Sequence, residues 1–257
     1  MIILKTKDEI QQFKKAGWLS AKVLREVGYM CNPGISTLEL DELAEHIITI
    51  EGGIPAFKGY NGFPASICAS VNNEVIHGIP KREKILQEGD IISIDTGAIV
   101  DGWVGDNAWT FAVGSISKEK QLLLDVTEQC MWESLSKAIP GNTIGDIGSA
   151  CQKLAKKYKF GVVREYVGHG VGRTMHEEPS VPNYGKPGSG CVLKPGMTLA
   201  IEPMINAGSY KTCLGSDGWL VTTYDNKPSA HFEKSIAITD SGYEILTCEP
   251  DYLRPVD

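Results

Sequence analysis

Two segments of this sequence repeat the same pattern at a separation of 107 residues. In each copy a Ser or Thr stands three residues before an acid, which is the spacing of a capping box at a helix start, and apolar residues follow at helical spacing. The same separation relates Gly89 to Gly196 and Asp95 to Glu202, so each copy also has a β-like run near an acid. The matched positions around the two helices are Pro33 and Pro140, Gly34 and Gly141, Ser36 and Thr143, Glu39 and Asp146, Leu40 and Ile147, and Ile47 and Leu154. Two segments that share one offset predict a duplicated α+β unit.

The duplication predicts a single domain, 1–257, made of two halves of about 1–114 and 115–257. The chain has 257 residues, of which 42% are hydrophobic, so it can bury one sizeable core. We therefore expect the two halves to share one core.

Each half should contribute two helices and a set of strands. The first helix is amphipathic and runs to about Tyr29, and Lys118 to Ala138 is its expected counterpart. Ser229 to Thr239 is the expected partner of the strand that holds Glu202. These helix-helix-strand halves would form a central antiparallel sheet covered by helices, with their acids meeting at the centre.

Composition limits the surroundings and partners of the chain. It contains no run of eighteen apolar residues, and its first residues pass directly into a charged amphipathic pattern, so we expect no membrane span and no signal peptide. The seven scattered cysteines include no CxxC pair, which favours reduced thiols in the cytoplasm. A net charge of -7 without a Lys/Arg cluster argues against a nucleic-acid partner. We expect a monomer.

A predicted hairpin brings two acids together. Ile91 to Val100 and Trp103 to Val113 are β-like runs on either side of Asp101-Gly102, which is a strong hairpin signal. A two-residue loop there places Asp95 and Asp106 on the same face as diagonal neighbours, roughly 7–8 Å apart at the backbone. The alternative, two solvated acids on an edge strand, fits poorly because the surrounding runs are apolar.

Two further acids lie in apolar, β-like surroundings. These are Glu202 after the run Met197 to Ile201, and Glu233 in HFEKSIAIT. Four converging buried carboxylates could not all stay ionised unaided, whereas two divalent cations would balance their charge. His169, between glycines on an expected turn, is a fifth candidate ligand, although a lone histidine there is more often a loop residue.

Five segments together resemble methionine aminopeptidases of the bacterial type I class. They are NEVIHGIP, IDTGAIVDGWVGDNA, YVGHGVGRTMHEEP, TLAIEPMI and SAHFEKS, and the resemblance covers nearly the whole chain. The five-ligand pattern is shared by the wider pita-bread fold, which also includes prolidases and aminopeptidase P. The first and third segments favour the methionine branch. The resemblance implies an enzyme that removes the initiator methionine from nascent proteins and prefers a small second residue.

The resemblance also implies roles for the candidate residues. Two divalent ions (Co, Mn, Fe or Zn) would be bridged by Asp106 and Glu233, with Asp95 on one ion and His169 and Glu202 on the other. An activated water would attack the scissile carbonyl, and Glu202 would move its proton. His176 would donate to the oxyanion and His77 would orient the peptide. Each of these two histidines, taken alone, is as readily a structural imidazole.

A pocket for the methionine side chain is implied at five further positions. They are Tyr60, Phe63, Cys68, Met175 and Trp219. Plain core packing is the competing explanation for Cys68 or Met175. The sequence departs from the family pattern, which commonly has tyrosine at Phe63, phenylalanine at Met175, threonine at Gly97 and histidine at Lys234. These departures affect the shape of the pocket and leave the five ligands unchanged.

Two rival functions are tested below. A prolidase or aminopeptidase P would share the five ligands but normally adds an N-terminal domain, for which this chain has no room. A binding protein that kept the fold and lost catalysis would be expected to lose ligands. Whether the enzyme works alone or docked to the ribosome is left open by the sequence.

Overall fold

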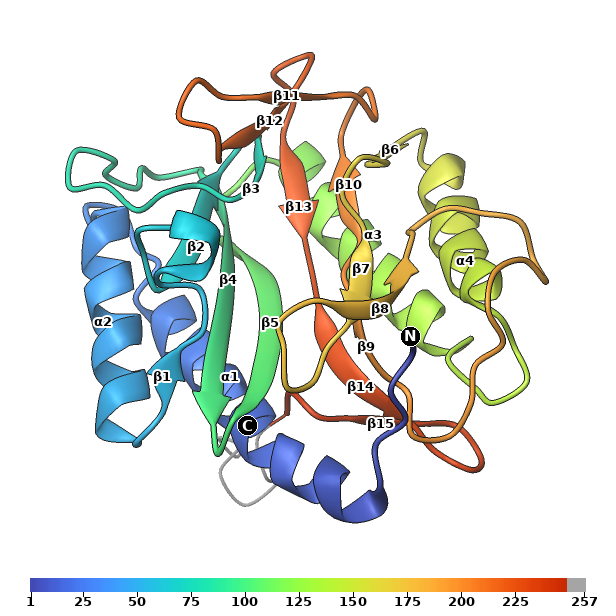
Figure 1. The fold of residues 1–257 in the computed structure, drawn as a ribbon. Helices are drawn as coiled ribbons and strands as arrows, with labels where there is room; N and C mark the ends of the chain where they lie inside the picture. The colour runs from blue at the N-terminus through green and yellow to red at the C-terminus, as the bar shows by residue number, and fades with distance from the viewer. Residues whose placement is uncertain (249–257) are drawn as a thin grey trace.

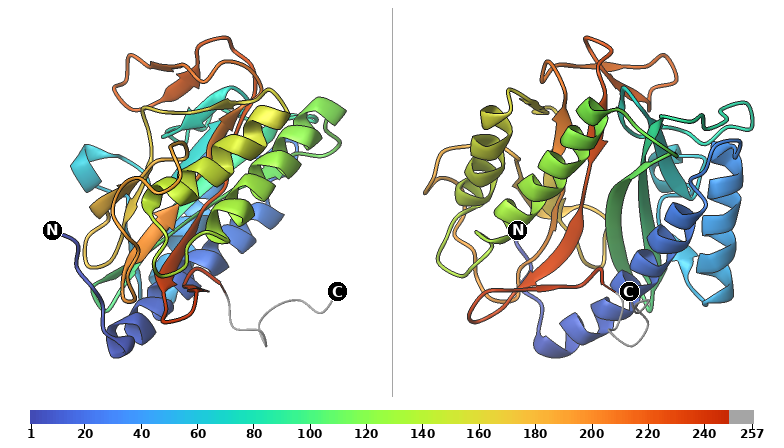
Figure 2. Two further views of the ribbon diagram at one scale, coloured as in Figure 1. Left: turned by 90° about the vertical axis from the view of Figure 1, so that its right-hand side faces the viewer. Right: turned by 180° about the vertical axis from the view of Figure 1, so that it is seen from behind.

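The computed structural model describes residues 1–248. The strands and helices of both halves form one body, in which helices α1, α3 and α4 lie along one face of the strands (Figures 1 and 2). The helices are α1 (Lys7–Tyr29), α2 (Thr37–Ile50), α3 (Lys118–Leu135) and α4 (Ile144–Lys157), with a short 3-10 turn at Tyr60–Gly62. No helix in this part of the chain has the length and apolar character needed to span a membrane.

Within residues 1–248, fifteen strands are distributed between the two halves. The first half contains β1 (Ile54–Pro55), β2 (Ile67–Val71), β3 (Glu74–Ile76), β4 (Ile91–Val100) and β5 (Trp103–Ala112). The second contains β6 (Gly161–Val162), β7 (Gly168–Gly170), β8 (Glu177–Val181), β9 (Thr198–Ile201), β10 (Met204–Asn206), β11 (Thr212–Leu214), β12 (Val221–Thr223), β13 (Ser229–His231), β14 (Lys234–Ile238) and β15 (Tyr243–Ile245).

The strands pair antiparallel in several sheets. In the first half β4 is central, pairing with β1, β2 and β5, and in the second half a five-stranded sheet has the order β15-β14-β9-β7-β8. The backbone N–H of Glu233 donates to the carbonyl of Ala108 on β5 at 2.9 Å, which joins the halves. The strands are thus divided among several sheets, where the sequence predicted one central sheet.

The predicted hairpin register is confirmed. Val100 is opposite Trp103, and Asp95 is opposite Ala108. Asp106 lies two residues along β5, so the two acids share a face as expected.

The predicted strand Ser229 to Thr239 is interrupted, which the sequence analysis missed. β13 pairs with β10 and β14 pairs with β9, and the break between them contains Glu233. The partner strand is broken at the same level, because Glu202 is followed by Pro203, whose ring nitrogen cannot donate to a ladder. Both acids therefore lie at strand ends, and the strand expected to hold Glu202 ends at Ile201.

The sequence repeat has a counterpart in the backbone hydrogen bonds. Gly34 N–H donates to the carbonyl of Leu86 at 2.8 Å, and 107 residues later Gly141 N–H donates to that of Leu193 at 3.1 Å. Isolated bridges join Ser36 to Ile85 and Thr143 to Val192, again at one offset. Capping boxes begin both α2 and α4, as predicted. These matched contacts support our proposal of two related halves within one domain.

Within residues 1–248, three large buried clusters of apolar side chains and a smaller one that contains Val75 and Val163 hold the layers together. One lies beneath α3 and α4 and another beneath α1 and α2. The third contains Phe13 and Trp103, whose rings stack at 5.6 Å, together with Phe63, Cys68 and Met175. Because this third cluster contains predicted pocket residues, the pocket wall is part of the core.

Helix α1 lies so close to β5 that a side chain at Gly105 has no room. A Cβ there would lie 2.6 Å from the backbone nitrogen of Gly17, and backbone cannot move aside as a flexible side chain can. Gly105→Ala is therefore expected to lower the free energy of unfolding by about 1–3 kcal/mol, as overpacking usually does. Urea unfolding measures the change. Gly242→Ala is the matched control, because nothing lies within 4 Å of a Cβ at that position. Equal midpoints for the two variants would contradict the close approach of α1 to β5.

Candidate metal centre

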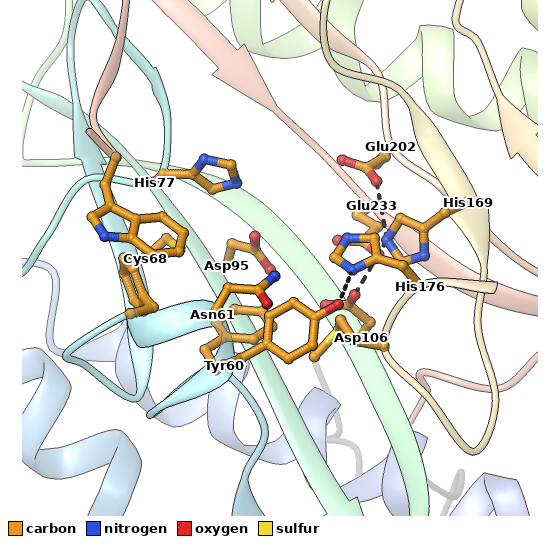
Figure 3. A pocket seen from close by; sticks show the side chains of 14 residues that line it. Tyr60, Asn61, Cys68, His77, Asp95, Asp106, His169, His176, Glu202 and Glu233 are labelled. Atoms are coloured by element: carbon orange, nitrogen blue, oxygen red, sulfur yellow. Dashed lines mark hydrogen bonds and ion pairs between the residues drawn. The ribbon is translucent and has the colours of Figure 1, made fainter. Parts of the chain in front are cut away.

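All twelve predicted site residues line one pocket, with a cavity volume of about 210 Å³. The carboxylates occupy its centre, with His77 on one side and His169 and His176 on the other (Figure 3). Its lining consists of Tyr60, Phe63, Cys68, His77, Asp95, Asp106, His169, Met175, His176, Glu202, Trp219 and Glu233, together with Phe57 and Asn61.

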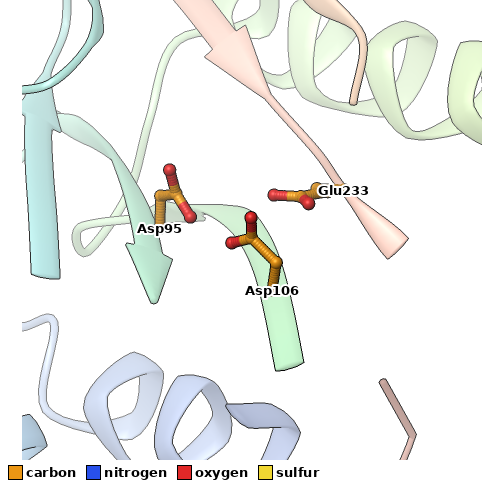
Figure 4. Close-up of side chains that lie close together, drawn as sticks. All are labelled: Asp95, Asp106 and Glu233. Carbon is orange, nitrogen blue, oxygen red and sulfur yellow. The ribbon is translucent and has the colours of Figure 1, made fainter. Parts of the chain in front are cut away.

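Three carboxylates converge from three strands. Asp95 comes from β4, Asp106 from β5 and Glu233 from the break before β14. One oxygen from each lies within 4.8 Å of the other two, and the side chains point toward one another (Figure 4). Each of the three side chains also has a buried oxygen without a hydrogen-bond partner: Asp95 Oδ1, Asp106 Oδ1 and Glu233 Oε1. Unpartnered buried oxygens of like charge are the pattern expected where a cation binds.

His169 and Glu202 extend the cluster on the second half. His169 Nδ1 is 2.9 Å from the carbonyl of Gly170, and since a carbonyl can only accept, Nδ1 carries the proton. Nε2 therefore presents a lone pair toward Asp106 Oδ2 at 3.6 Å and Glu202 Oε1 at 3.4 Å. A lone pair that faces two carboxylates is unfavourable unless a cation or a proton lies between them, and the bond to the carbonyl fixes the ring in the orientation of a metal ligand.

The position of His169 differs from the predicted one. The sequence placed it on a turn, but it lies in β7, which pairs with β9 and β8. The flanking glycines are needed because neighbouring backbone approaches closely: a Cβ on Gly168 would lie 3.1 Å from the carbonyl oxygen of Val181. Close strand packing, rather than a turn, explains the GHG sequence.

Burial changes the acidity of every group in the cluster. It raises the pKa of Asp106 to about 7. Burial, and next the charge of Asp106, raises the pKa values of Asp95, Glu202 and Glu233 well above their ordinary range. Burial lowers the pKa of His169 to about 4, so its imidazole is neutral and can be a ligand at neutral pH. Without a cation the carboxyls would keep protons.

The donor set fits a divalent cation of the first transition series. It offers four carboxylates and one neutral imidazole, a combination suited to Mn, Fe, Co or Zn, and affinity alone does not choose among them. The partly buried Lys234 is next to Glu233 in sequence but is directed elsewhere, since its Nζ donates to Asn107 Oδ1 at 2.9 Å. A bound cation is therefore the natural partner of these carboxylates.

The other two predicted histidines lie on opposite walls. His176 Nδ1 is 2.8 Å from the Tyr60 hydroxyl, and its ring centroid is 4.2 Å from that of His169. His77 has a left-handed backbone, φ 59°, which is unfavourable for a residue with a side chain and is found preferentially at functional sites. Burial lowers the pKa of His77 to about 4 and also lowers that of His176.

The apolar wall is formed by the predicted pocket residues. The rings of Phe63 and Trp219 meet edge to face at 5.1 Å, and the ring of His77 lies 6.1 Å from that of Trp219. Cys68 and Met175 are buried beside them. These residues thus have both predicted properties, since they pack in the core and also face the cavity.

Three residues of the site were not found from the sequence. Phe57 and Asn61 line the pocket from the Gly/Pro-rich stretch, where no periodic pattern indicates side-chain direction. His231 is buried with Nε2 3.4 Å from Glu202 Oε2, and burial lowers its pKa to about 3. Its spacing two residues before Glu233 was an available signal, because alternate residues of a strand share a face.

The raised carboxyl pKa values predict how the stability of the metal-free protein depends on pH. A group whose pKa is raised on folding stabilises the folded state below its unfolded value, and this contribution is lost as pH rises through the folded value. Below pH 6.5 the histidines oppose this trend, since their pKa values are lowered. Above pH 8 Lys234 opposes it, since burial lowers its pKa to about 8.

Between pH 6.5 and 8 the metal-free protein should therefore lose stability as pH rises. The expected slope is about 1.4 kcal/mol per pH unit for each carboxyl that holds a proton only in the folded state. Urea unfolding at a series of pH values, with and without Mn²⁺, measures it. Saturating Mn²⁺ should remove the slope, and a flat metal-free profile would show that the carboxyls are ionised without a cation.

Comparisons with known proteins agree with this geometry. Residues 11–240 match the metallopeptidase family M24. The chain is 51% identical to methionine aminopeptidase 1 of Bacillus subtilis over 96% of this chain and 99% of that protein. It is 49% identical to the methionine aminopeptidase of Clostridium acetobutylicum, covering 97% of this chain and all of the relative. The crystal structure of methionine aminopeptidase from Rickettsia prowazekii, 43% identical, superposes with a TM-score of 0.95 over 96% of this chain and 100% of that one.

The more distant prolidases share the fold alone. The prolidase from Pyrococcus horikoshii superposes with a TM-score of 0.78 at 24% identity, and this chain covers 66% of it. The predicted pita-bread fold is confirmed by these structures, and the M24 match implies the use of divalent metal. By sequence and by structure, the chain belongs to metallopeptidase family M24, beside the bacterial methionine aminopeptidases.

Proposed function

We propose that this chain is a metal-dependent aminopeptidase that removes the initiator methionine from nascent polypeptides, with preference for a small second residue. The observation that carries the proposal is a single cavity in which five metal-binding side chains adjoin an apolar wall. The relatives that share about half of its sequence are named methionine aminopeptidases.

The five donors would hold two divalent ions. Asp106 has neighbouring ligands on two sides, Asp95 and Glu233 on one and His169 on the other. The carboxylates of Asp106 and Glu233 would therefore suit ligands that both ions share. Asp95 would complete one ion, and His169 with Glu202 the other. When bound, such ions polarise a carbonyl and make a water molecule acidic near neutral pH.

Glu202 is the proposed proton carrier. Its carboxylate lines the cavity with Oε1 3.4 Å from His169 Nε2, where it would be next to a water activated by the bound cations and could accept a proton from it. The proton can then pass from Glu202 to the leaving amine. His231 Nε2 lies 3.4 Å from Glu202 Oε2 without a hydrogen bond, so this imidazole is a buried polar neighbour of the carboxylate.

His176 is placed to stabilise the oxyanion. Its pKa is lowered by burial, so the ring is neutral and carries one proton. When the Tyr60 hydroxyl donates to Nδ1, that proton is on Nε2, which is then a donor to the substrate carbonyl. His77, on the opposite wall, would orient the peptide.

The apolar wall would bind the methionine side chain. Tyr60, Phe63, Cys68, Met175 and Trp219 offer aromatic and sulfur-containing surfaces that suit a thioether. The acidic cluster beside this wall favours a free α-amine, which would restrict cleavage to the first residue. We further propose that the enzyme acts as a monomer in the cytoplasm. None of the cysteines at positions 1–248 forms a disulfide, in keeping with a reducing compartment.

A peptide panel tests the proposed activity. With Mn²⁺ or Co²⁺ present, Met-Gly-type peptides should be cleaved in preference to peptides that begin with Leu or Arg. An apolar pocket separates side chains that differ by one methylene by only about 1–3 kcal/mol, so similar linear side chains should show residual cleavage. Activity on Xaa-Pro peptides alone would indicate a prolidase, and an inert protein that binds no metal would indicate a binding protein.

Replacing His176 tests its role in turnover. His176→Ala should lower kcat by about 10² to 10³-fold, the usual effect of losing one oxyanion donor. Metal content, measured by mass spectrometry, should stay unchanged because the ligands are intact. His46→Ala, on the exposed face of α2, is the matched control and should keep wild-type kcat. Unchanged turnover in His176→Ala would remove this residue from the mechanism.

A further inference from the structure

The segment before α1 packs against the loop that carries His176. The N-terminus lies beside β8 and β9, although α1 itself crosses to the other half (Figure 1). The loop joins β7 to β8, spans 171–176, and contributes Met175 and His176 to the pocket. Neither the N-terminal segment nor the acid that follows His176 has a role in the proposed reaction.

A buried ion pair joins the segment to this loop. Lys5 Nζ pairs with Glu177 Oε2, and the two side chains are only 3% and 7% exposed. The other oxygen, Glu177 Oε1, accepts from the backbone N–H of Arg173 at 3.0 Å. Glu177 therefore connects the start of the loop to its end, and Lys5 connects both to the N-terminal segment.

Backbone contacts fix Lys5 itself. Its N–H donates to the carbonyl of Gly196 at 2.7 Å, and its Nζ also donates to the carbonyl of Ile3 at 3.2 Å. A Cβ on Gly172 would lie 2.8 Å from Lys5 Cε, and one on Gly196 would lie 2.7 Å from the Lys5 carbonyl oxygen. Lys5 thus packs against Gly172 of the loop and against Gly196 before β9, with no room for a side chain at either glycine.

The far side of the loop is fixed from the first half. Arg173 Nη1 donates to the carbonyl of Asp101 at 2.8 Å, and its guanidinium lies over the ring of Trp103 at 4.0 Å. Within the loop, Gly172 N–H donates to the Thr174 carbonyl at 3.1 Å. The Lys5 pair is an attachment on the side next to His176, because Glu177 is its direct neighbour, and it acts beside the contact of the Tyr60 hydroxyl with His176 Nδ1 at 2.8 Å.

We propose that Lys5 is a positioning residue, which through its buried ion pair with Glu177 holds the loop 171–176 in place and so sets His176 and Met175 against the metal centre. Removing either partner leaves a buried charge without compensation, which the loop would relieve by moving toward water. The expected effect on turnover rests on the proposed aminopeptidase activity. The expected effect on the position of loop 171–176 does not depend on that activity.

A double-mutant cycle tests the proposal. The wild type is compared with Lys5→Met, Glu177→Gln and the double variant. Lys22→Met is the control, because Lys22 Nζ lies 2.6 Å from Glu51 Oε1 and neither of these residues lines the pocket. The measurements are kcat and KM on a Met-Gly-type peptide with Mn²⁺ well below the melting temperature, metal content, and amide hydrogen exchange of residues 171–177.

Lys5→Met should lower kcat by about 10- to 100-fold, because small misplacement of a catalytic group has effects of this order. Amide exchange in 171–177 should become faster, while metal content and the control variant keep wild-type values. The double variant should lose no more than either single one, as expected for residues that act as a pair.

Two results would overturn the proposal: wild-type kcat in Lys5→Met, whatever the exchange rate, or loss of kcat without faster exchange. If Lys5→Met does not fold, Glu177→Gln and the uncharged double variant are read by the same criteria. Failure of the wild type to cleave methionine peptides would refute the proposed activity instead, and the exchange measurement would still decide whether Lys5 holds the loop.

Discussion

The mutual repulsion of four buried carboxylates is the constraint on which this structure depends. Asp106, Glu202 and Glu233 lie within a few ångströms of the His169 lone pair or of Asp95, and burial raises the pKa of every acid in the group. Such a cluster is unfavourable in an apolar core unless cations balance it. The fold positions these groups for a ligand, at the expense of the stability of the metal-free chain. The interruptions of β9 and β14 beside Glu202 and Glu233 occur where those acids enter the pocket.

The duplication that we propose would account for two of the acids at this point. The halves meet where the backbone N–H of Glu233 donates to the carbonyl of Ala108, within β5. Asp95 and Glu202 are related by the same offset as the capping boxes and the glycine turns. We infer that an acid at this position of the repeat is kept in both halves, although Asp95 lies within β4 and Glu202 follows the end of β9. The histidines come from non-equivalent positions, so the repeat alone does not place them.

Local patterns gave the sequence-based predictions that are confirmed. The hairpin around Asp101-Gly102 is specified by its loop, and its register fixes Asp95 and Asp106 on one face. The position of His169 in a strand could not be read locally, because a glycine pair is equally typical of a turn and of close strand packing. The place of Phe57 depends on a long-range contact with β4 at Gly97, which no spacing within its own segment records, whereas the spacing of His231 from Glu233 was a signal that could have been used.

The departures from the family pattern differ in consequence because of where they lie. Lys234 is directed away from the pocket, toward Asn107 and the face of Trp109, so its replacement of histidine does not alter the methionine-binding wall. Gly97 is different. A Cβ there would lie 2.7 Å from Phe57 Cε1, so the ring of Phe57 occupies the space that a threonine side chain would need. Because Phe57 lines the pocket, the glycine at position 97 lets this aromatic ring pack against β4 beside the cavity, while the proposed metal ligand Asp106, opposite Gly97, stays in register.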